Sequence, residues 1–223
     1  MGGLSSPPFD SFNLGDHVGD DPARVAANRA RLAAAVGLPA HRVVWMNQIH
    51  SDRVVLVKEP DGAVIQDTDA LVTSTSRLAL AVVTADCVPV LMADAEAGVV
   101  AAVHAGRAGA QRGIVVRAVE AMLAAGAGLS GIAVLLGPAI SGRNYEVPVA
   151  MADDVEASLP GSRTVTSTGT TGLDLRAGIA CQLSSLGITA IDSDPRCTFT
   201  DPTLFSYRRD AQTGRLASLV WME

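Results

Sequence analysis

Positive charge is scarce in this sequence, and lysine is nearly absent. The chain has 223 residues, with 17 lysine and arginine side chains against 23 acidic ones, and Lys58 is its single lysine. The formal net charge is -6, and no run of basic side chains occurs. Because nucleic-acid binding depends on a basic surface that neutralises phosphates, we expect no nucleic-acid partner. A small anionic substrate is compatible with this composition.

Cysteine is also scarce, and long apolar runs are absent. Cys87, Cys181 and Cys197 are an odd number at wide spacings, which argues against a disulfide framework and for a reducing compartment. The apolar run at 78–83 is too short to span a bilayer, and residues 1–12 do not resemble a signal peptide. We therefore expect a cytoplasmic protein with no membrane partner. No feature of the sequence specifies an oligomeric state.

Aromatic residues make up only 4% of the chain, although hydrophobic residues make up 48%. The core must therefore consist mainly of alanine, valine and leucine, whose small side chains favour closely packed layers. A chain of this length suits one globular domain. We expect residues 1–223 to form a single domain.

Turn residues divide the chain into short apolar runs. The first helix is expected to begin at Asp20 or Asp21, with Pro22 in its first turn, and to end at Gly37. Strands are expected at 42–45, 53–58, 70–73, 78–84, 88–93, 99–104 and 132–136. Further helices are expected at 110–125, 150–158 and 173–186, followed by a hairpin of 204–208 with 215–221. Strict alternation of strands and helices is missing, which predicts an α+β fold with sheet layers covered by helices.

Two neighbouring strands bring reactive side chains to one end of a predicted hairpin. If the turn centres on residues 95–96, Cys87 lies opposite His104, and cross-strand Cβ atoms on one face are about 4.5–5.5 Å apart. A slip of one residue would place the two side chains on opposite faces. Pro89 weakens the pairing there, since proline cannot donate to the ladder. In this register a thiolate and an imidazole converge.

His50 ends another apolar run, at 43–50. With Cys87 and His104 it forms a set of three ligands that leaves a fourth position open, which is the pattern of catalytic zinc. Zinc in such a site lowers the pKa of a bound water to about 7. The sequence has no HExxH or CxxC spacing. The residues alone therefore leave open a metal-free pair, with Cys87 as nucleophile and His104 as its base.

Seven segments, taken in order, resemble the laccase-domain purine nucleoside phosphorylase family, whose members are also described as polyphenol oxidases or peptidoglycan editing factors. The segments are 13–15 with 17–21, 47–50, 69–73, 84–90, 103–106, 137–140 and 205–210. Each segment is short, but their number and order make the resemblance specific.

The resemblance implies a layered α/β/β/α fold, similar to that of the cytotoxic necrotising factor catalytic domain. It implies a metal ion bound by His50, Cys87 and His104. The expected metal is zinc, and copper is the alternative. The activities that it implies are phosphorolysis of adenosine, inosine and methylthioadenosine, together with deamination of adenosine. Purine nucleosides and phosphate are therefore the expected partners.

Roles for further residues follow from the same resemblance. Asp86 and Cys87 are the predicted catalytic residues, with Asp86 a candidate proton carrier. The predicted substrate-binding residues are Asn13, Arg29, Gln48, Arg143 and Arg208. Two alternatives stay open: a Cys-His hydrolase that edits peptidoglycan precursors, and a copper-dependent polyphenol oxidase (laccase). Four histidines cannot furnish a multicopper set.

One segment departs from the family pattern. The family usually continues His-Ala-Gly with Trp-Arg-Gly, whereas this chain has Arg107, Ala108 and Gly109. If the family's arginine supports phosphate or substrate, Arg107 or Arg112 must replace it here. The departure affects the residue expected to bind phosphate or substrate in phosphorolysis. It leaves the three predicted metal ligands unchanged.

Overall fold

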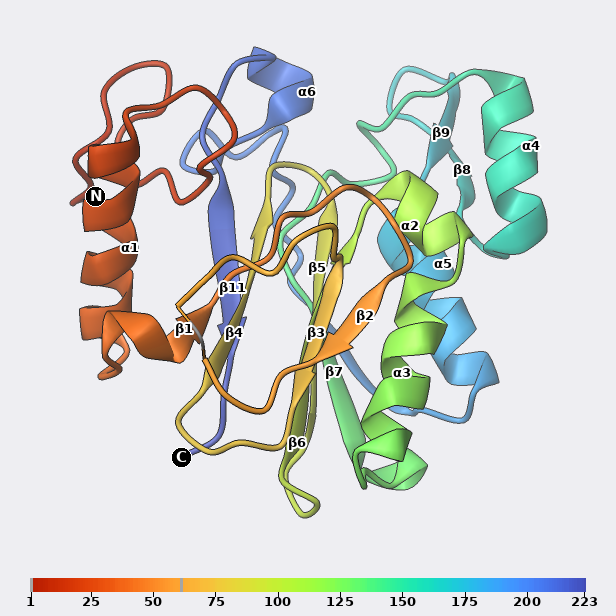
Figure 1. Cartoon of the computed structure of the whole chain (residues 1–223). Helices are drawn as coiled ribbons and strands as arrows, with labels where there is room; N and C mark the ends of the chain where they lie inside the picture. The colour runs from red at the N-terminus through yellow and green to blue at the C-terminus, as the bar shows by residue number, and fades with distance from the viewer. Residues whose placement is uncertain (1, 61) are drawn as a thin grey trace.

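Two β-sheets face each other, and helices cover their outer sides (Figure 1). The computed structural model describes residues 2–60 and 62–223. The larger sheet has the strand order β10-β7-β5-β6-β3-β2, and the smaller has the order β1-β4-β11. Strands β8 and β9 form a separate two-stranded sheet, and β9 also makes an isolated antiparallel bridge between Gly172 and Glu146.

The elements are short, as expected from the frequent turn residues. The strands are β1 Val43–Val44, β2 Val54–Leu56, β3 Ala70–Thr73, β4 Ala79–Thr84, β5 Val88–Asp94, β6 Val99–Ala105, β7 Ile132–Leu136, β8 Arg163–Val165, β9 Thr171–Leu173, β10 Ala190–Ser193 and β11 Leu216–Val220. The helices are α1 Pro22–Ala35, α2 Arg107–Gln111, α3 Ile114–Ala124, α4 Val149–Ser158, α5 Leu175–Ser185 and α6 Tyr207–Asp210. Within the described ranges, no helix is both long and apolar enough to cross a membrane.

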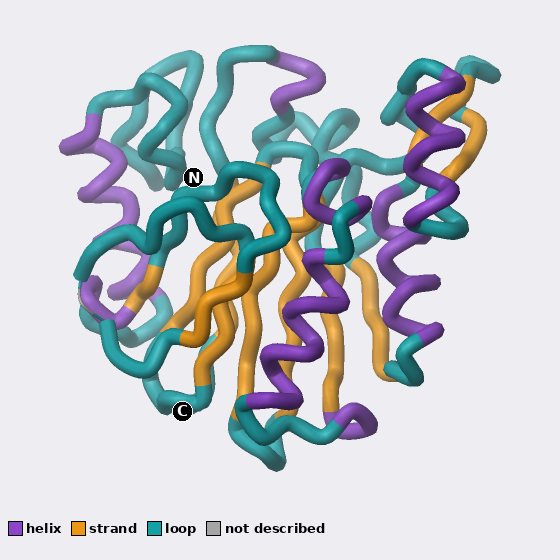
Figure 2. The backbone as a smooth tube through the Cα atoms, turned by 45° about the vertical axis from the view of Figure 1, so that its right-hand side comes forward, coloured by secondary structure: helices purple, strands orange, loops and turns teal. Residues whose placement is uncertain are grey.

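Alternation along the strands divides the apolar side chains between layers. In β4, Ala79 and Ala81 pack with Ala33 of α1, whereas Leu80 and Val82 pack between the two sheets. The outer face of the larger sheet packs against α3 and α5, and Figure 2 shows α3 running along these strands. Helix α4 lies against β8 and β9 and contributes to the same core. Both sheets are thus covered on two sides, which explains their nearly continuous apolar runs.

This layering confirms the predicted α/β/β/α order and the α+β class. The first helix also forms as predicted. The Asp21 side chain accepts a hydrogen bond of 2.8 Å from the Ala23 amide, and Gly37 takes a positive φ of 72° just after the helix. The likeness to the cytotoxic necrotising factor domain and the assignment of 1–223 to one domain stay predictions.

The predicted helix at 110–125 is two helices in the structure. Gly113 has φ 82° and separates α2 from α3, because glycine adopts this left-handed conformation without steric cost. The first of the two helices begins at Arg107, which places this arginine in a helix beside the end of β6.

The predicted hairpin at the C-terminus is wrong. Residues 207–210 form α6, since the Ser206 hydroxyl caps the turn and accepts a hydrogen bond from the Arg209 amide. Strand β11 pairs with β4 instead, in antiparallel register. The sequence pattern also misses β8, β9 and β10; β10 lies at a sheet edge and is mostly exposed, so it carries no apolar alternation.

The hairpin of β5 and β6 forms, but its register differs from the predicted one by two residues. His104 lies opposite Pro89, and Val88 lies opposite Ala105. A shift of two residues keeps each side chain on its face, so Cys87 and His104 still lie on the same side. The His104 amide donates to the Asp69 carbonyl at 2.7 Å, on the side of β3. Pro89 therefore costs no hydrogen bond between β5 and β6 at this pair.

Candidate metal centre

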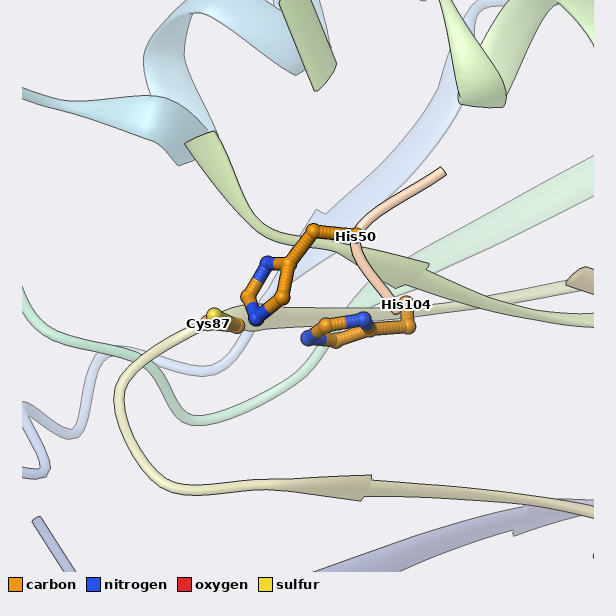
Figure 3. A group of neighbouring side chains, drawn as sticks. All are labelled: His50, Cys87 and His104. Atoms are coloured by element: carbon orange, nitrogen blue, oxygen red, sulfur yellow. The ribbon is translucent and has the colours of Figure 1, made fainter. Parts of the chain in front are cut away.

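Three side chains from separate segments converge at one end of the facing sheets (Figure 3). His50 follows β1, Cys87 precedes β5 and His104 lies in β6, and one ligand atom of each lies within 4.8 Å of the others. The two imidazole rings meet edge to face, with centroids 4.7 Å apart. His50 is exposed, Cys87 is half-buried and His104 is buried. The structure therefore brings together the residues that the sequence predicts as metal ligands.

A buried carboxylate fixes the loop that carries His50. Asp69, directly before β3, accepts hydrogen bonds from the amides of Ile49, His50 and Ser51 at 3.2, 3.0 and 2.7 Å. The Ser51 hydroxyl adds a fourth bond of 2.7 Å. These bonds stabilise a loop in which His50 has a positive φ of 60°, a conformation that is unfavourable for most residues.

The same carboxylate also orients His104. Asp69 Oδ1 lies 2.8 Å from His104 Nδ1, so the imidazole donates from Nδ1, and loss of the Nε2 proton leaves that nitrogen as the ligand atom. In Figure 3 the free edge of the ring points toward Cys87 and His50. Carboxylates that accept from a ligating histidine fix its tautomer and raise its basicity. One side chain thus positions two of the three predicted ligands.

The charges of the site favour a bound cation. Burial opposes protonation of His104, but the Cys87 thiolate and the Asp69 carboxylate outweigh this effect and raise its pKa to about 9. Burial, reinforced by the neighbouring His104, lowers the pKa of His50. Burial also acts to raise the pKa of Asp69, yet its hydrogen bonds from His104 and Ser51 hold that pKa below the usual value. Asp69 therefore stays ionised beside the cluster.

Gly106 leaves the space that the ligands occupy. A Cβ atom at this position would lie 2.4 Å from Nδ1 of His50 and 3.1 Å from Sγ of Cys87. The backbone of Gly106, with φ -73° and ψ 166°, is open to any residue. Space, and not backbone conformation, is therefore what requires glycine here.

Cys87 is positioned by a tight turn and by its neighbour Asp86, which has φ 95°. The Asp86 carboxylate accepts hydrogen bonds from the hydroxyls of Thr198 and Ser206 at 2.5 and 2.7 Å and from the Arg208 amide at 2.6 Å. Asp86 thereby ties the segment before α6 to the strand that carries Cys87. Its role as a proton carrier stays a prediction.

Gln48 connects the His50 loop to the smaller sheet. Its amide nitrogen donates to the Val83 carbonyl at 2.7 Å, and its amide oxygen accepts from the Val83 N–H at 2.8 Å. Both ends of the side chain are therefore engaged with β4. This contact explains the residue without a substrate, and a direct substrate contact stays a prediction.

Two other predicted substrate-binding residues also have structural partners. Asn13 is buried, and its oxygen accepts from the amides of Gly15 and Arg215 at 2.9 and 2.8 Å. Arg29 lies over the Trp45 ring at 4.1 Å and pairs with a carboxylate oxygen of Asp16 at 3.2 Å. These contacts account for both side chains within the fold.

The remaining two predicted residues differ in their surroundings. Arg143 is exposed, and the contacts found for it are those of its backbone carbonyl with Ser167. Arg208 lies over the Tyr145 ring at 4.8 Å and lines a small pocket together with Cys87. Of the predicted substrate-binding side chains, the structure places Arg208 beside the ligand cluster.

Sequence reasoning misses Asp69, Gly106 and Tyr145. Asp69 directly precedes a buried strand, and Gly106 directly follows the strand of His104, so both lie in segments that carry the family resemblance. Their roles depend on contacts across the chain, which spacing does not reveal. Tyr145 lies in the loop that carries Arg143, and its ring, not that arginine, lines the pocket.

The donor set fits a divalent metal ion. Two imidazoles and one thiolate are ligands for zinc or copper, and three protein ligands leave a coordination position for water or substrate. The hydrogen bond that His104 donates to Asp69 orients a ligand, as such a site requires, and Gly106 leaves the ligands their space. The sulfur and nitrogen donors do not suit magnesium or calcium, which prefer oxygen ligands.

Known proteins are similar to this chain in sequence and in fold over its whole length. The family described as multi-copper polyphenol oxidoreductase laccase matches residues 1–223. The chain belongs to this family. A protein of Mycobacterium tuberculosis named purine nucleoside phosphorylase is 75% identical over 222 residues, covering 100% of this chain and 89% of that protein. A protein of the same name from Corynebacterium glutamicum is 59% identical, covering 99% of this chain and 91% of its own length.

A solved structure of the same fold is YlmD from Geobacillus stearothermophilus. It matches with a TM-score of 0.93 and 33% identity, covering 100% of this chain and 89% of that protein. The family assignment predicted from the seven segments is thereby confirmed.

Loss of any one predicted ligand should remove the metal. We expect the alanine variants of His50, Cys87 and His104 to fall from about one divalent metal ion per chain to a trace, because two remaining ligands hold such an ion weakly. Elemental analysis of the purified variants measures this content. Cys181→Ala is the matched control, since Cys181 is an exposed free thiol on α5 and its replacement should leave the metal content unchanged. Full metal content in Cys87→Ala would contradict the assignment.

Filling the space at Gly106 should weaken metal binding while leaving the backbone unstrained. Overpacking costs about 1–3 kcal/mol, and here the displaced groups are the His50 ring and the Cys87 sulfur. We expect Gly106→Ala to raise the dissociation constant of the bound metal correspondingly in a competition titration with a chelator. Gly128→Ala is the control, because its Cβ would lie 3.8 Å from Asp94 Oδ2 at an unstrained φ of -97°. Equal affinities for the two variants would show that Gly106 does not crowd the ligands.

Replacing the carboxylate behind the ligands should also reduce metal affinity. Asp69→Asn removes the negative acceptor of His104 Nδ1, and changes of this kind typically cost about 10–100-fold in affinity. The same chelator titration measures the loss. Asp52→Asn serves as control, since Asp52 pairs with the exposed Arg117 at 2.9 Å and surface pairs contribute about 0–1 kcal/mol. An unchanged metal affinity in Asp69→Asn would show that Asp69 does not support metal binding.

Proposed function

We propose that this chain is a zinc-dependent purine nucleoside phosphorylase that also deaminates adenosine. The observation that carries the proposal is the cluster of His50, Cys87 and His104, which adjoins a pocket lined by two arginines. The full-length relatives named purine nucleoside phosphorylase support the reaction class. Adenosine, inosine and methylthioadenosine are the proposed nucleosides, and the free thiols suit the proposed cytoplasmic location.

Phosphorolysis exchanges one bond at the anomeric carbon of the sugar. A phosphate oxygen forms a bond to C1′, and the bond from C1′ to N9 of the purine breaks. The electron pair of that bond goes to the purine, which also gains the proton given up by phosphate. The products are a free purine and a pentose 1-phosphate, so no oxidant or reductant is needed.

Residues of this chain can assist that exchange at two points. Guanidinium groups hold the negative charge of phosphate, and Arg107 and Arg208 line the pocket beside Cys87. The ring of Tyr145, on which Arg208 lies, offers an aromatic face beside the same pocket. A bound zinc ion would supply Lewis-acid stabilisation of developing negative charge.

Deamination of adenosine is the second proposed activity. Water supplies the oxygen that replaces the amino group at C6, and ammonia leaves. The open coordination position of a set with three ligands supports this reaction, since such positions take water. Asp86 is the proposed proton carrier, and its proximity to Cys87 in the chain places it at the wall of the pocket.

One observation favours a metal-free alternative. Asp69, His104 and Cys87 form a chain of carboxylate, imidazole and thiolate, which is the arrangement of cysteine hydrolases. Such an enzyme would act on an amide of a peptidoglycan precursor. Activity that survives a chelator, together with labelling of Cys87 by iodoacetamide, would support this alternative over the zinc enzyme.

Copper chemistry is the other alternative, in keeping with the family's description. Blue-copper sites use two histidines, one cysteine and a weak axial methionine. A protein that purifies with copper and shows an intense blue absorption band would support a polyphenol oxidase. Zinc content without such a band supports the proposed nucleoside enzyme.

Incubation with adenosine, with and without inorganic phosphate, tests the proposal directly. We expect adenine, hypoxanthine and ribose 1-phosphate only when phosphate is present, as measured by liquid chromatography. Inosine should accumulate without phosphate and be partly converted to hypoxanthine with it. The His104→Ala protein should produce none of these compounds, because it lacks a metal ligand. If the zinc-loaded wild-type protein leaves adenosine, inosine and methylthioadenosine unchanged, the proposed function is wrong.

A further inference from the structure

A small pocket lies directly against Cys87, one of the three predicted metal ligands. It has a volume of about 60 Å³ and is lined by Cys87, Arg107, Tyr145 and Arg208, with Ile140 and Leu175 as apolar walls. Sites for drug-sized ligands measure about 300–1,000 Å³. The pocket is therefore too small for a whole nucleoside and suits a compact ion or a single substituent.

The two arginines at this pocket lack acidic partners. Arg107 Nη1 donates to Gln111 Oε1 at 3.4 Å, and Arg208 Nη1 donates to the Glu146 carbonyl at 2.9 Å. Across the residues that the structure describes, neither guanidinium forms an ion pair with a carboxylate, whereas Arg163 pairs with Asp153 at 3.0 Å. Most of the donor N–H groups of both side chains are thus open to a ligand.

The acidic group of the pocket wall is already engaged. Asp86 also lines the pocket, but its carboxylate accepts from the hydroxyls of Thr198 and Ser206 and from the Arg208 amide. Its third bond holds the backbone of Arg208, so Asp86 positions that arginine and does not pair with its guanidinium. Asp86 keeps its negative charge, but three neutral donors occupy its oxygens, so it leaves the guanidinium donors of the two arginines open to an entering group.

We propose that this pocket is a subsite for inorganic phosphate, held by Arg107 and Arg208. Guanidinium groups recognise phosphate through paired N–H donors, and Cys87 in the wall places the ion next to the metal centre. The inference rests on the proposed phosphorylase function and names the residues that bind its second substrate. Arg107 occupies the position at which the family usually has tryptophan, so the subsite does not depend on the family's arginine. Arg29 and Arg143 have no part in it.

Kinetic constants for phosphate test the subsite. With the nucleoside saturating and the zinc-loaded enzyme intact, we expect Arg107→Ala to raise the KM for inorganic phosphate by about tenfold or more, since hydrogen bonds to charged groups are worth this much. The KM for the nucleoside should change by less than about twofold. Arg107→Lys should recover part of the loss, because it restores the charge without the paired donors. Arg163→Ala, on β8, is the matched control and should behave as wild type.

Calorimetric titration of the zinc-loaded protein with inorganic phosphate separates this inference from the proposed function. If wild-type protein binds phosphate and Arg107→Ala does not, the subsite stands even when no nucleoside is turned over. If phosphorolysis occurs but Arg107→Ala and Arg107→Lys both keep the wild-type KM for phosphate, the subsite is wrong and the function stands. A rise confined to the KM for the nucleoside would also overturn it, because Arg107 would then bind the nucleoside. Zinc content and thermal unfolding of each variant exclude a folding defect as the cause.

Discussion

The candidate site depends on one buried carboxylate, that of Asp69. It accepts hydrogen bonds from the loop of His50 and from the ring of His104, and these two residues lie on opposite sides of it in the chain. A charge removed from water is unfavourable unless hydrogen bonds compensate for it, and here five donors do so. The carboxylate and the two histidines therefore stabilise one another, and neither ligand would keep its place without this shared acceptor.

Two further side chains extend this arrangement to the rest of the molecule. Gln48 joins the His50 loop to β4 of the smaller sheet, and Asp86 joins the turn of Cys87 to the segment before α6. The site is thus assembled at the end of the facing sheets from elements of both. Side chains hold the loops that carry it, together with backbone bonds such as those from the Asn47 amide to the Ile65 carbonyl and from the Ile140 amide to the Asp86 carbonyl. Each of these polar groups bonds to backbone or hydroxyl groups, which gives little freedom for substitution.

Much of this could be predicted from the sequence, and the exceptions have physical reasons. The first and last residues of β3 and β7 can be predicted correctly because their apolar runs end at turn residues. The convergence of Cys87 and His104 followed from a local hairpin, and an error of two residues in its register left both on the same face. The contact of His50 with them depends on Asp69, a long-range interaction that no local spacing encodes. Short elements such as α6 and β10 also escape prediction, since a serine cap and an exposed edge leave no periodic apolar signal.

The separation of the three ligands along the chain has a consequence for the unfolding of the protein. An ion shared by His50, Cys87 and His104 acts as a cross-link that closes two long loops, and it binds only where the folded chain has assembled all three. Any ligand that binds the native state alone stabilises it by mass action, by about 2.7 kcal/mol at a free concentration one hundred times its dissociation constant. The melting temperature of this protein should therefore depend on the concentration of free metal, so that its persistence in a cell is coupled to metal supply.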